Sequence, residues 1–396
     1  MRVQSGHNQE AEKQGEVMSS TGKSYQRVAI VMLGFISGSV VAQSGGEPIV
    51  EPTVLRSIPA ETTAAAYIDP DWEVPRTSWG HPSLEGVWST DDMRSVPMNR
   101  PERFGTRERM TDEEFLERAR NDENGRDFAV NIGTFLRHEW GIRSFGYTSL
   151  ITDPPNGRMP EATALGKAMS ATRPRGTFGP GPFNSFDDFS LYDRCITRGA
   201  LGSFLPVIYG NGLRIVQNPN FVALSYEMIH ETRIVPLDGR RHVDDRIRQY
   251  LGNARGYWDG DTLVIETTNF TNRTNVGANG GGPANTEGLK LTERFTRVDP
   301  GMIEFTATVE DPDALTAPFT LRVMITTQPD YRVYEYSCHE GNGAVINSLT
   351  GERVYEKQVE AALAKGLPAP ARAVEHGEIR NADFEQLQIF DINAGE

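Results

Sequence analysis

The fold is decided by residues 221–270, FVALSYEMIHETRIVPLDGRRHVDDRIRQYLGNARGYWDGDTLVIETTNF. The first fifteen of these residues are rich in Val, Leu, Tyr, Met, Ile and Thr and contain no Gly or Pro, which predicts a β-strand over 221–235. Strands usually have about 5–6 residues, so we expect a bend or a bulge in this one. Alternation along a strand places His230 and Glu231 on opposite faces unless the bulge re-aims one of them.

Two Asp-Gly pairs in this stretch predict tight turns. Asp238-Gly239 follows the long strand, and Asp259-Gly260 separates residues 254–258 from residues 261–268. Glycine supplies the positive φ that such turns require. The second pair therefore predicts a β-hairpin, whose second arm alternates between polar and apolar residues.

Short apolar segments continue along the chain and are separated by turn residues. The pattern predicts further strands at 147–152, 213–217, 289–298, 302–310, 319–326 and 331–338. A capping box at Thr111-Asp-Glu-Glu114 predicts a helix through Ala119, and a second helix is expected over 352–365. Consecutive strands joined by tight turns are typical of an antiparallel meander.

The segment Gly86-Val-Trp88, at the first ordered strand, resembles the Gly-x-Trp motif of lipocalin-type barrels, in which the Trp plugs the barrel floor. Together with the meander it leads us to expect a mainly β protein. The fold that we predict is an antiparallel up-and-down, calycin/lipocalin-like barrel with an N-terminal arm and a few helices. Another type of barrel or a sandwich stays open.

The N-terminal region has the features of a secretory signal peptide. Lys23 and Arg27 precede an apolar run at 28–42 that ends in small residues. The run is shorter than the roughly 20 residues of a transmembrane helix, although an uncleaved anchor is the alternative. Translation starts at Met1, or at Met18 if the polar segment before the apolar run is not part of the protein.

We accordingly divide the chain into a signal peptide (1–42), a linker or surface arm (43–80), a β-barrel domain (81–350) and a C-terminal helix and tail (351–396). The expected location is periplasmic or secreted. The net charge of −14 disfavours nucleic acids and anionic membrane surfaces as partners, since both select clustered Lys and Arg. We expect a small-molecule partner, no nucleic acid and no membrane span after cleavage. The oligomeric state stays open.

The only two cysteines, Cys195 and Cys338, lie in the part of the chain that we expect to be exported. In an oxidising compartment they most simply form a disulfide. Such a bond stabilises by about 3–5 kcal/mol when it closes a long loop. Two buried free thiols, a nucleophile or a metal ligand are the alternatives.

Three His-Glu pairs occur in a chain that has seven histidines, at 138–139, 230–231 and 339–340. Histidine titrates near neutral pH, and burial raises the pKa of Glu toward it, so such pairs suit acid–base catalysis. We take His230, Glu231, His339 and Glu340 as the candidate catalytic residues. The alternative is that they are ordinary polar residues on solvated faces.

A disulfide would also bring Arg194 and Arg198 close to His339 and Glu340. Either arginine then binds a substrate carboxylate or an oxyanion, or forms a structural salt bridge to Glu340. Tyr226, Trp258 and Tyr336 are the aromatic residues that we expect to line a pocket.

Cofactor chemistry has little support in the sequence. No His-x-His or His-x-x-x-His spacing falls on an expected element, so we predict no metal, although two His and two Glu would suit one. The Gly-rich segment at 275–283 lacks the spacing of a phosphate loop, and no serine lies in a Gly-x-Ser-x-Gly elbow. We therefore expect no cofactor.

A set of motifs resembles a large group of exported bacterial proteins of unknown function. The motifs are DPPNGRMP (153–160), MIHETRIVPLDGR (228–240), GYWDGDTLVIETTNF (256–270), ERF (293–295) and CHEGN (338–342). The resemblance covers about residues 80–350 and implies export, but no activity. Where this group often has His-Ser/Thr-Glu, this chain has Asn285-Thr-Glu287.

These features favour a secreted, cofactor-independent acid–base enzyme that acts on a small organic molecule in a barrel pocket, as a lyase, isomerase, hydratase or hydrolase. The alternative is a non-catalytic, lipocalin-like periplasmic protein that binds a small molecule. A structural protein of the cell envelope is a third reading, based on the N-terminal arm.

Overall fold

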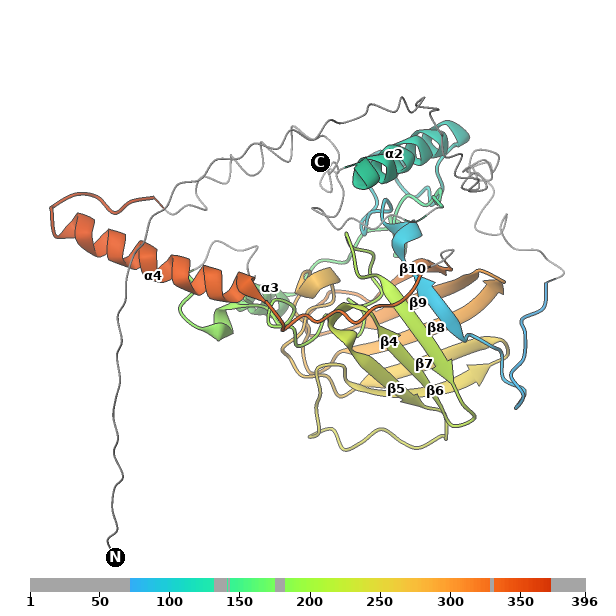
Figure 1. Cartoon of the computed structure of the whole chain (residues 1–396). Coiled ribbons are helices and arrows are strands. Elements are labelled where there is room, and N and C mark those ends of the chain that lie inside the picture. The colour runs from blue at the N-terminus through green and yellow to red at the C-terminus, as the bar shows by residue number, and fades with distance from the viewer. Residues whose placement is uncertain (1–71, 132–140, 142, 175–181, 328–330, 372–396) are drawn as a thin grey trace, which may run out of the picture. The chain divides into compact units, whose positions relative to one another are not determined.

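The described part of the chain is built around one ten-stranded antiparallel sheet (Figure 1). In this computed structural model the described residues are 72–131, 141, 143–174, 182–327 and 331–371. The expected signal peptide, the alternative start at Met18, most of the arm and the pair His138-Glu139 lie outside them. The mainly β class is confirmed.

The sheet follows the chain closely. Its strands are β1 (Gly86–Ser89), β2 (Ile151–Asp153), β3 (Gly212–Gln217), β4 (Phe221–Tyr226), β5 (Thr232–Pro236), β6 (Asn253–Asp259), β7 (Thr262–Thr268), β8 (Lys290–Asp299), β9 (Met302–Glu310) and β10 (Phe319–Thr326). They lie in the order β5-β4-β3-β1-β10-β9-β8-β7-β6, and β2 pairs with β10. Because β6 to β10 are neighbours both in the chain and in the sheet, the predicted meander is confirmed.

The strand predicted at 331–338 does not form. Residues 331–337 have no regular secondary structure. Both sides of the preceding strand, β10, are already occupied, by β9 on one side and by β1 and β2 on the other. A further strand therefore has no free edge of β10 to pair with.

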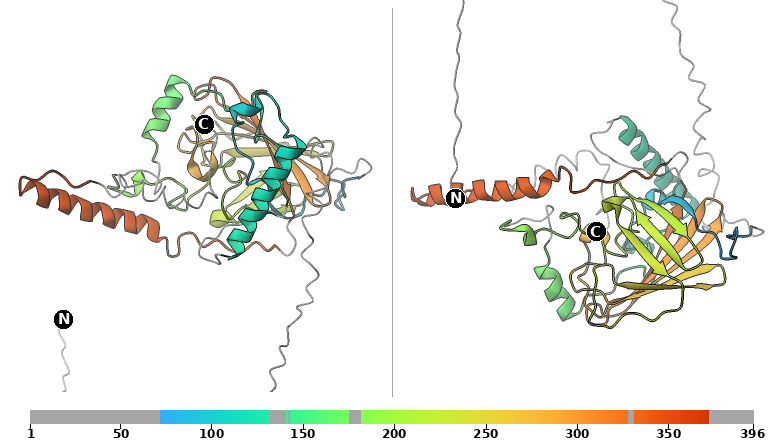
Figure 2. Two further views of the ribbon diagram at one scale, coloured as in Figure 1. Left: turned by 90° about the horizontal axis from the view of Figure 1, so that it is seen from above. Right: turned by 60° about the horizontal axis from the view of Figure 1, so that its bottom comes forward.

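The sheet curls until its two edge strands, β5 and β6, lie side by side (Figures 1 and 2). The strand pairing of the described residues includes no β5–β6 ladder, so the closed barrel that we predicted is not confirmed. Side chains occupy this seam instead. A Cβ on Gly256 of β6 would lie 2.8 Å from side-chain atoms of both Val235 and Leu237.

The long strand predicted over 221–235 is in fact a β-hairpin of β4 and β5. The chain reverses through a 3₁₀ turn at Met228–His230, where Ile229 has φ 65° and His230 has φ 47°. A continuous strand would place Tyr226 and Arg233 on opposite faces. After the reversal, both side chains are buried. The turn lacks Gly, Pro, Asn and Asp, so no residue type marks it in the sequence.

Both Asp-Gly turns are present. Gly239 has φ 71° and Gly260 has φ 59°, and the second turn joins β6 to β7 as expected. The capping box is also confirmed, because the Glu114 amide donates to Thr111 Oγ1 at 3.3 Å and the Thr111 amide donates to Glu114 Oε2 at 2.7 Å.

The helices extend further than the sequence pattern indicates. Helix α2 (Asp112–Asn131) continues well past Ala119, and α4 (Gly343–Leu363) begins nine residues before the expected start at Glu352. Helix α3 (Ala164–Thr172) was not expected. No helix of the described residues is long and apolar enough to cross a bilayer.

Trp88 of β1 is a central residue of the core. Its side chain is 1% exposed, and its indole Nε1 donates to the Leu84 carbonyl oxygen at 3.0 Å. The Arg297 guanidinium lies over the ring, 5.3 Å from its centroid. The sequence expectation that Trp88 belongs to the sheet core is thus met.

We predict that Trp88→Ala lowers the free energy of unfolding by about 3–5 kcal/mol, because it leaves a cavity under β1. Chemical denaturation followed by circular dichroism measures this change. Tyr257→Ala is the control, since Tyr257 is 48% exposed, and it should cost less than about 0.5 kcal/mol. Equal effects of the two variants would contradict the assignment of Trp88 to the core.

Candidate functional site

The interior of the curled sheet is filled by side chains. Phe204, from the segment before β3, packs its ring 4.4 Å from Phe305, 5.4 Å from Phe295 and 5.2 Å from Tyr226, measured between centroids. The best-formed hollow in this apolar region has room for about one water molecule. This hollow is too small for an organic molecule.

A buried ion pair crosses the interior from β5 to β8. Arg233 donates to both carboxylate oxygens of Glu293, at 2.8 and 2.7 Å, and also to Thr267 Oγ1 of β7 at 3.2 Å. The two side chains are 3% and 0% exposed. Burial alone would lower the pKa of Arg233, but the Glu293 carboxylate outweighs it and the pKa is raised. This pair is therefore structural.

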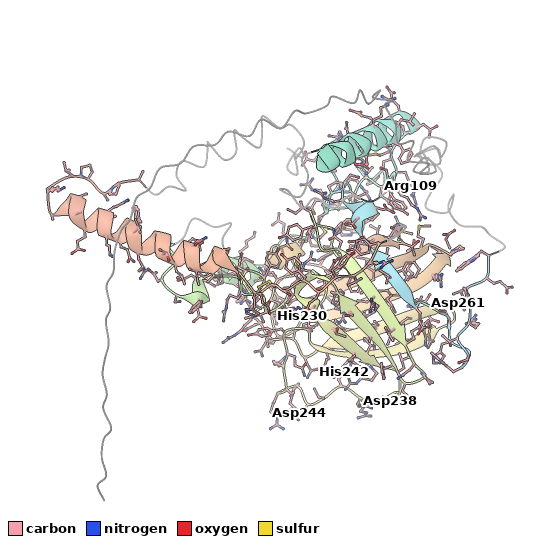
Figure 3. The ribbon with its side chains drawn as sticks, viewed as in Figure 1. Arg109, His230, Asp238, His242, Asp244 and Asp261 are labelled. Atoms are coloured by element: carbon pink, nitrogen blue, oxygen red, sulfur yellow. A yellow bond between two sulfur atoms is a disulfide. The ribbon has the colours of Figure 1, made fainter. Side chains whose placement is uncertain are left out.

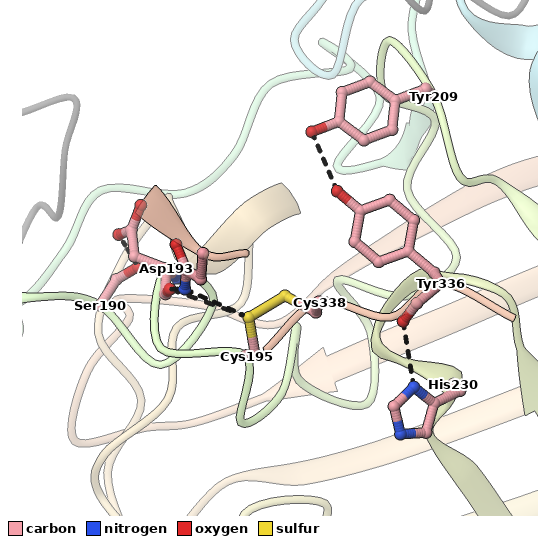
Figure 4. Close-up of a disulfide and its surroundings, with 8 residues drawn as sticks. Ser190, Asp193, Cys195, Tyr209, His230, Tyr336 and Cys338 are labelled. Carbon is pink, nitrogen blue, oxygen red and sulfur yellow. Dashed lines mark hydrogen bonds between the residues drawn. A yellow bond between two sulfur atoms is a disulfide. The ribbon is translucent and has the colours of Figure 1, made fainter. Parts of the chain in front are cut away.

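The predicted disulfide between Cys195 and Cys338 is present (Figure 4). It closes a loop with a sequence separation of 143 residues. Asn342 supports it, donating to the Asp193 carbonyl oxygen at 2.7 Å and to Cys195 Sγ at 3.4 Å. The disulfide fixes one end of residues 331–342, which we call the strap.

Side-chain contacts hold the rest of the strap against the turn between β4 and β5. The Tyr331 hydroxyl donates to the Glu227 carboxylate, and His230 Nδ1 lies 3.0 Å from the Tyr336 carbonyl oxygen. Because a carbonyl oxygen only accepts, Nδ1 of His230 is the donor in this contact. His230 lies at one end of the β4–β5 hairpin, whereas Asp238 and Asp244 lie near the other end (Figure 3).

Glu231 contacts a different segment of the chain from His230. Its carboxylate accepts a hydrogen bond from Thr197 Oγ1 at 2.8 Å and interacts electrostatically with Tyr226 and Arg233. Burial raises the pKa of Glu231, and the Thr197 hydrogen bond opposes this rise. Glu231 is thus a partly buried carboxyl group whose pKa is raised.

Of the predicted catalytic residues, only His230 and Glu231 have contacts in this region. His339 and Glu340 are exposed, and no hydrogen bond or ion pair of the described residues links their side chains to His230 or Glu231. Their predicted role in catalysis is therefore without geometric support, although the disulfide keeps them near the site.

The predicted binding residues are dispersed. Arg194 forms an ion pair with Asp187 at 3.3 Å rather than with Glu340. Trp258 packs its ring against His81, with centroids 5.5 Å apart. Tyr226 is buried beside the Arg233–Glu293 pair.

Arg198 and Tyr336, by contrast, belong to one cluster. Arg198 is 2% exposed and interacts electrostatically with Tyr192, Tyr209 and Tyr336. The rings of Tyr209 and Tyr336 are stacked with centroids 6.0 Å apart, and the Tyr336 hydroxyl donates to the Tyr209 hydroxyl at 3.4 Å (Figure 4). We use the name disulfide site for the region that contains these four residues, the disulfide, Thr197, His230 and Glu231.

Sequence reasoning missed Thr197, Tyr192 and Tyr209. The first two lie within three residues of Cys195, so closeness to a predicted disulfide was a usable signal for them. Tyr209 has no such signal, because only the fold of residues 196–212 brings it to the site.

A second polar cluster, at the end of β1, is structural. Asp91 accepts from Ser89 Oγ and from Asn211 Nδ2, the latter at 2.6 Å, and burial raises the pKa of Asp91. Asp92 accepts from Thr326 Oγ1 at 2.6 Å and from the Arg143 amide at 2.9 Å. In the described ranges, no three His, Cys, Asp or Glu residues are grouped so that they could hold a metal ion.

No protein-family model and no curated protein matches this chain. The functional assignment therefore rests on the geometry of the disulfide site.

We predict that Glu293→Gln destabilises the protein by about 3–5 kcal/mol, because it leaves the buried Arg233 without its counter-charge. The double variant Arg233→Met, Glu293→Leu should recover most of this loss, since apolar residues of similar volume replace a buried pair at little net cost. Denaturant melts of both variants measure the difference. A double variant no more stable than the single one would mean that the pair does not act as a unit.

Proposed function

We propose that this protein is an exported enzyme that performs acid–base chemistry on a small organic molecule at the disulfide site. The observation that carries the proposal is Glu231, a partly buried carboxyl group with a raised pKa and a Thr197 hydrogen bond. General acids and bases work best when their pKa lies near the operating pH, and burial is one way in which proteins achieve this. The reaction class is that of a lyase, isomerase, hydratase or hydrolase.

Backbone conformation around Glu231 supports this proposal. Ile229, His230 and Cys195 all have positive φ, at 65°, 47° and 57°, and all three lie at the disulfide site. Non-glycine residues occupy this region at a cost of about 1–3 kcal/mol each, and such strain concentrates at functional sites. The unfavourable conformation of Ile229, a β-branched residue, is the price of placing His230 and Glu231 on opposite sides of one turn.

His230 is the second proton carrier in this proposal. Its Nδ1 is engaged by the Tyr336 carbonyl oxygen, which leaves Nε2 on an exposed imidazole for proton exchange. Glu231 then exchanges a proton within the rim, while His230 exchanges one on the solvent side.

We further propose that the curled sheet is a calycin-like barrel whose β5–β6 seam is filled by side chains. The side-by-side position of these edge strands and the buried Trp88 of Gly86-Val-Trp88 support this proposal. Export to the periplasm or beyond, as in the bacterial group with the same motifs, is supported by the disulfide, because such bonds persist in oxidising compartments.

A non-catalytic binding protein of the lipocalin type is the alternative. Lipocalins hold their ligands inside the barrel, and here that space contains Phe204, Phe295 and Phe305. The filled interior favours the enzyme at the rim over the interior binder.

We predict that Glu231→Gln lowers turnover by about 10²- to 10⁴-fold, the usual contribution of a positioned acid or base. A panel of small organic molecules incubated with the protein, with products followed by mass spectrometry, identifies a substrate and measures the loss. Glu335→Gln is the control, because Glu335 is an exposed carboxylate on the strap. Equal rates in wild type and Glu231→Gln would refute the assignment, and no turnover of any compound would favour the binder.

If Glu231 acts as the base, activity should rise with pH through its pKa, which lies above the ordinary value of about 4.3. Thr197→Val removes the hydrogen bond that lowers this pKa, so the acidic limb of the pH–rate profile should move to higher pH. An unshifted or oppositely shifted limb would show that another group controls the rate.

A further inference from the structure

Arg198 is a buried cation without an acidic partner in the described part of the chain. Its guanidinium donates to the Gly210 carbonyl oxygen at 3.4 Å and to the Leu205 carbonyl oxygen at 3.3 Å, both long for N–H···O bonds. Its Nε has no hydrogen-bond partner among the described residues. Burial lowers the pKa of Arg198 to about 10, and no carboxylate contributes to its electrostatic surroundings.

Arg233 is a buried arginine that does have a carboxylate partner. It too lies in the interior, but Glu293 meets it with two short hydrogen bonds, at 2.7 and 2.8 Å. Buried charges in proteins are paired, because an uncompensated one is strongly destabilising. Among the described residues, then, Arg198 has no carboxylate partner of the kind that Arg233 has.

Three tyrosines, Tyr192, Tyr209 and Tyr336, interact electrostatically with Arg198. Tyr192, Tyr209 and Tyr336 are half-buried, and the Tyr192 and Tyr209 hydroxyl groups are hydrogen-bonded to each other. The Tyr209 and Tyr336 hydroxyl groups face each other at 3.4 Å, beyond the usual 2.5–3.0 Å range for O–H···O bonds (Figure 4). Each hydroxyl group has one proton, so donating it to an anion would replace its present contact with another tyrosine by a charge-assisted hydrogen bond.

We propose that Arg198, with Tyr192, Tyr209 and Tyr336, binds the carboxylate group of a small organic acid. One guanidinium and three neutral hydroxyl groups carry a single positive charge, which matches a carboxylate better than a phosphate dianion. The planar guanidinium also suits the two oxygens of a carboxylate.

This assignment names the substrate class of the proposed enzyme, and to that extent it rests on the proposed function. Thr197, the chain neighbour of Arg198, donates its hydrogen bond to Glu231. A carboxylate held by Arg198 therefore brings the rest of the molecule to the rim where Glu231 exchanges protons. Tyr336 belongs to the strap, so the disulfide helps to keep one of the three donors in place.

Isothermal titration calorimetry on the oxidised protein tests carboxylate binding without any turnover. The probes are sodium acetate and sodium benzoate, with benzamide as the neutral match for benzoate and sodium phosphate as the alternative anion, all at constant ionic strength. We expect saturable binding of at least one carboxylate and none of benzamide. Failure of both carboxylates to bind, or tighter binding of phosphate, overturns the proposal.

Tyrosine variants test whether the carboxylate binds at this cluster. Tyr209→Phe and Tyr336→Phe keep the ring and remove the hydroxyl group, so each should weaken carboxylate binding about 10-fold, the usual value of a hydrogen bond to a charged group. Tyr334→Phe is the matched control, because Tyr334 lies on the same strap and is 71% exposed. Wild-type affinity in both Phe variants overturns the assignment.

Arg198→Met separates binding from a structural role. It should abolish carboxylate binding while leaving the melting temperature of the ligand-free protein unchanged or higher, because a buried charge without a partner is removed. A lower melting temperature with intact binding overturns the proposal. Glu231→Gln should still bind the carboxylate, so a failure of the proposed catalysis is distinguishable from a failure of the anion site.

Discussion

The ion pair between Arg233 and Glu293 is the interaction on which the curled shape of the sheet depends. Arg233 lies on the edge strand β5, whereas Glu293 and Thr267 lie on β8 and β7, at the opposite side of the seam. Backbone hydrogen bonds do not join β5 to β6, so this pair and the side chains of Val235 and Leu237 hold the two edges together. The two short hydrogen bonds to Glu293 matter for stability, because removing one partner of a buried ion pair leaves the other charge uncompensated.

Much of the sheet was predictable because its strands alternate strongly and its turns contain glycine. Strands β3 and β6 to β10 and the Asp-Gly turns follow from these local signals. The β4–β5 turn was not predictable, since Met228–His230 has strand-forming residues, and its positive φ values are imposed by the tertiary structure. Arg233 pairs with Glu293, 60 residues later, only if both side chains lie on the interior face of the sheet. The unexpected turn places Arg233 on that face.

Part of the candidate site was likewise predictable from the sequence, and part was not. Counting cysteines in a chain that we expect to be exported predicted the disulfide, and the disulfide led us to consider Arg198. The grouping of His230 with His339 was expected from a strand at 331–338, and without that strand the two side chains have no shared geometry. Thr197 and Tyr209 were missed because their positions depend on an irregular segment between Cys195 and β3, which has no periodicity to read.

The different surroundings of Arg233 and Arg198 explain why stability and the proposed function occupy different parts of one sheet. Arg233 is neutralised within the chain, so the seam is stable without any ligand. Arg198 lies among hydroxyl and carbonyl groups, next to a turn that holds Ile229 and His230 in unfavourable conformations. Proteins retain such costs where binding or catalysis requires them. The disulfide and the Arg233–Glu293 pair are the interactions that allow the rim to carry both the unpaired charge and the strained turn without unfolding.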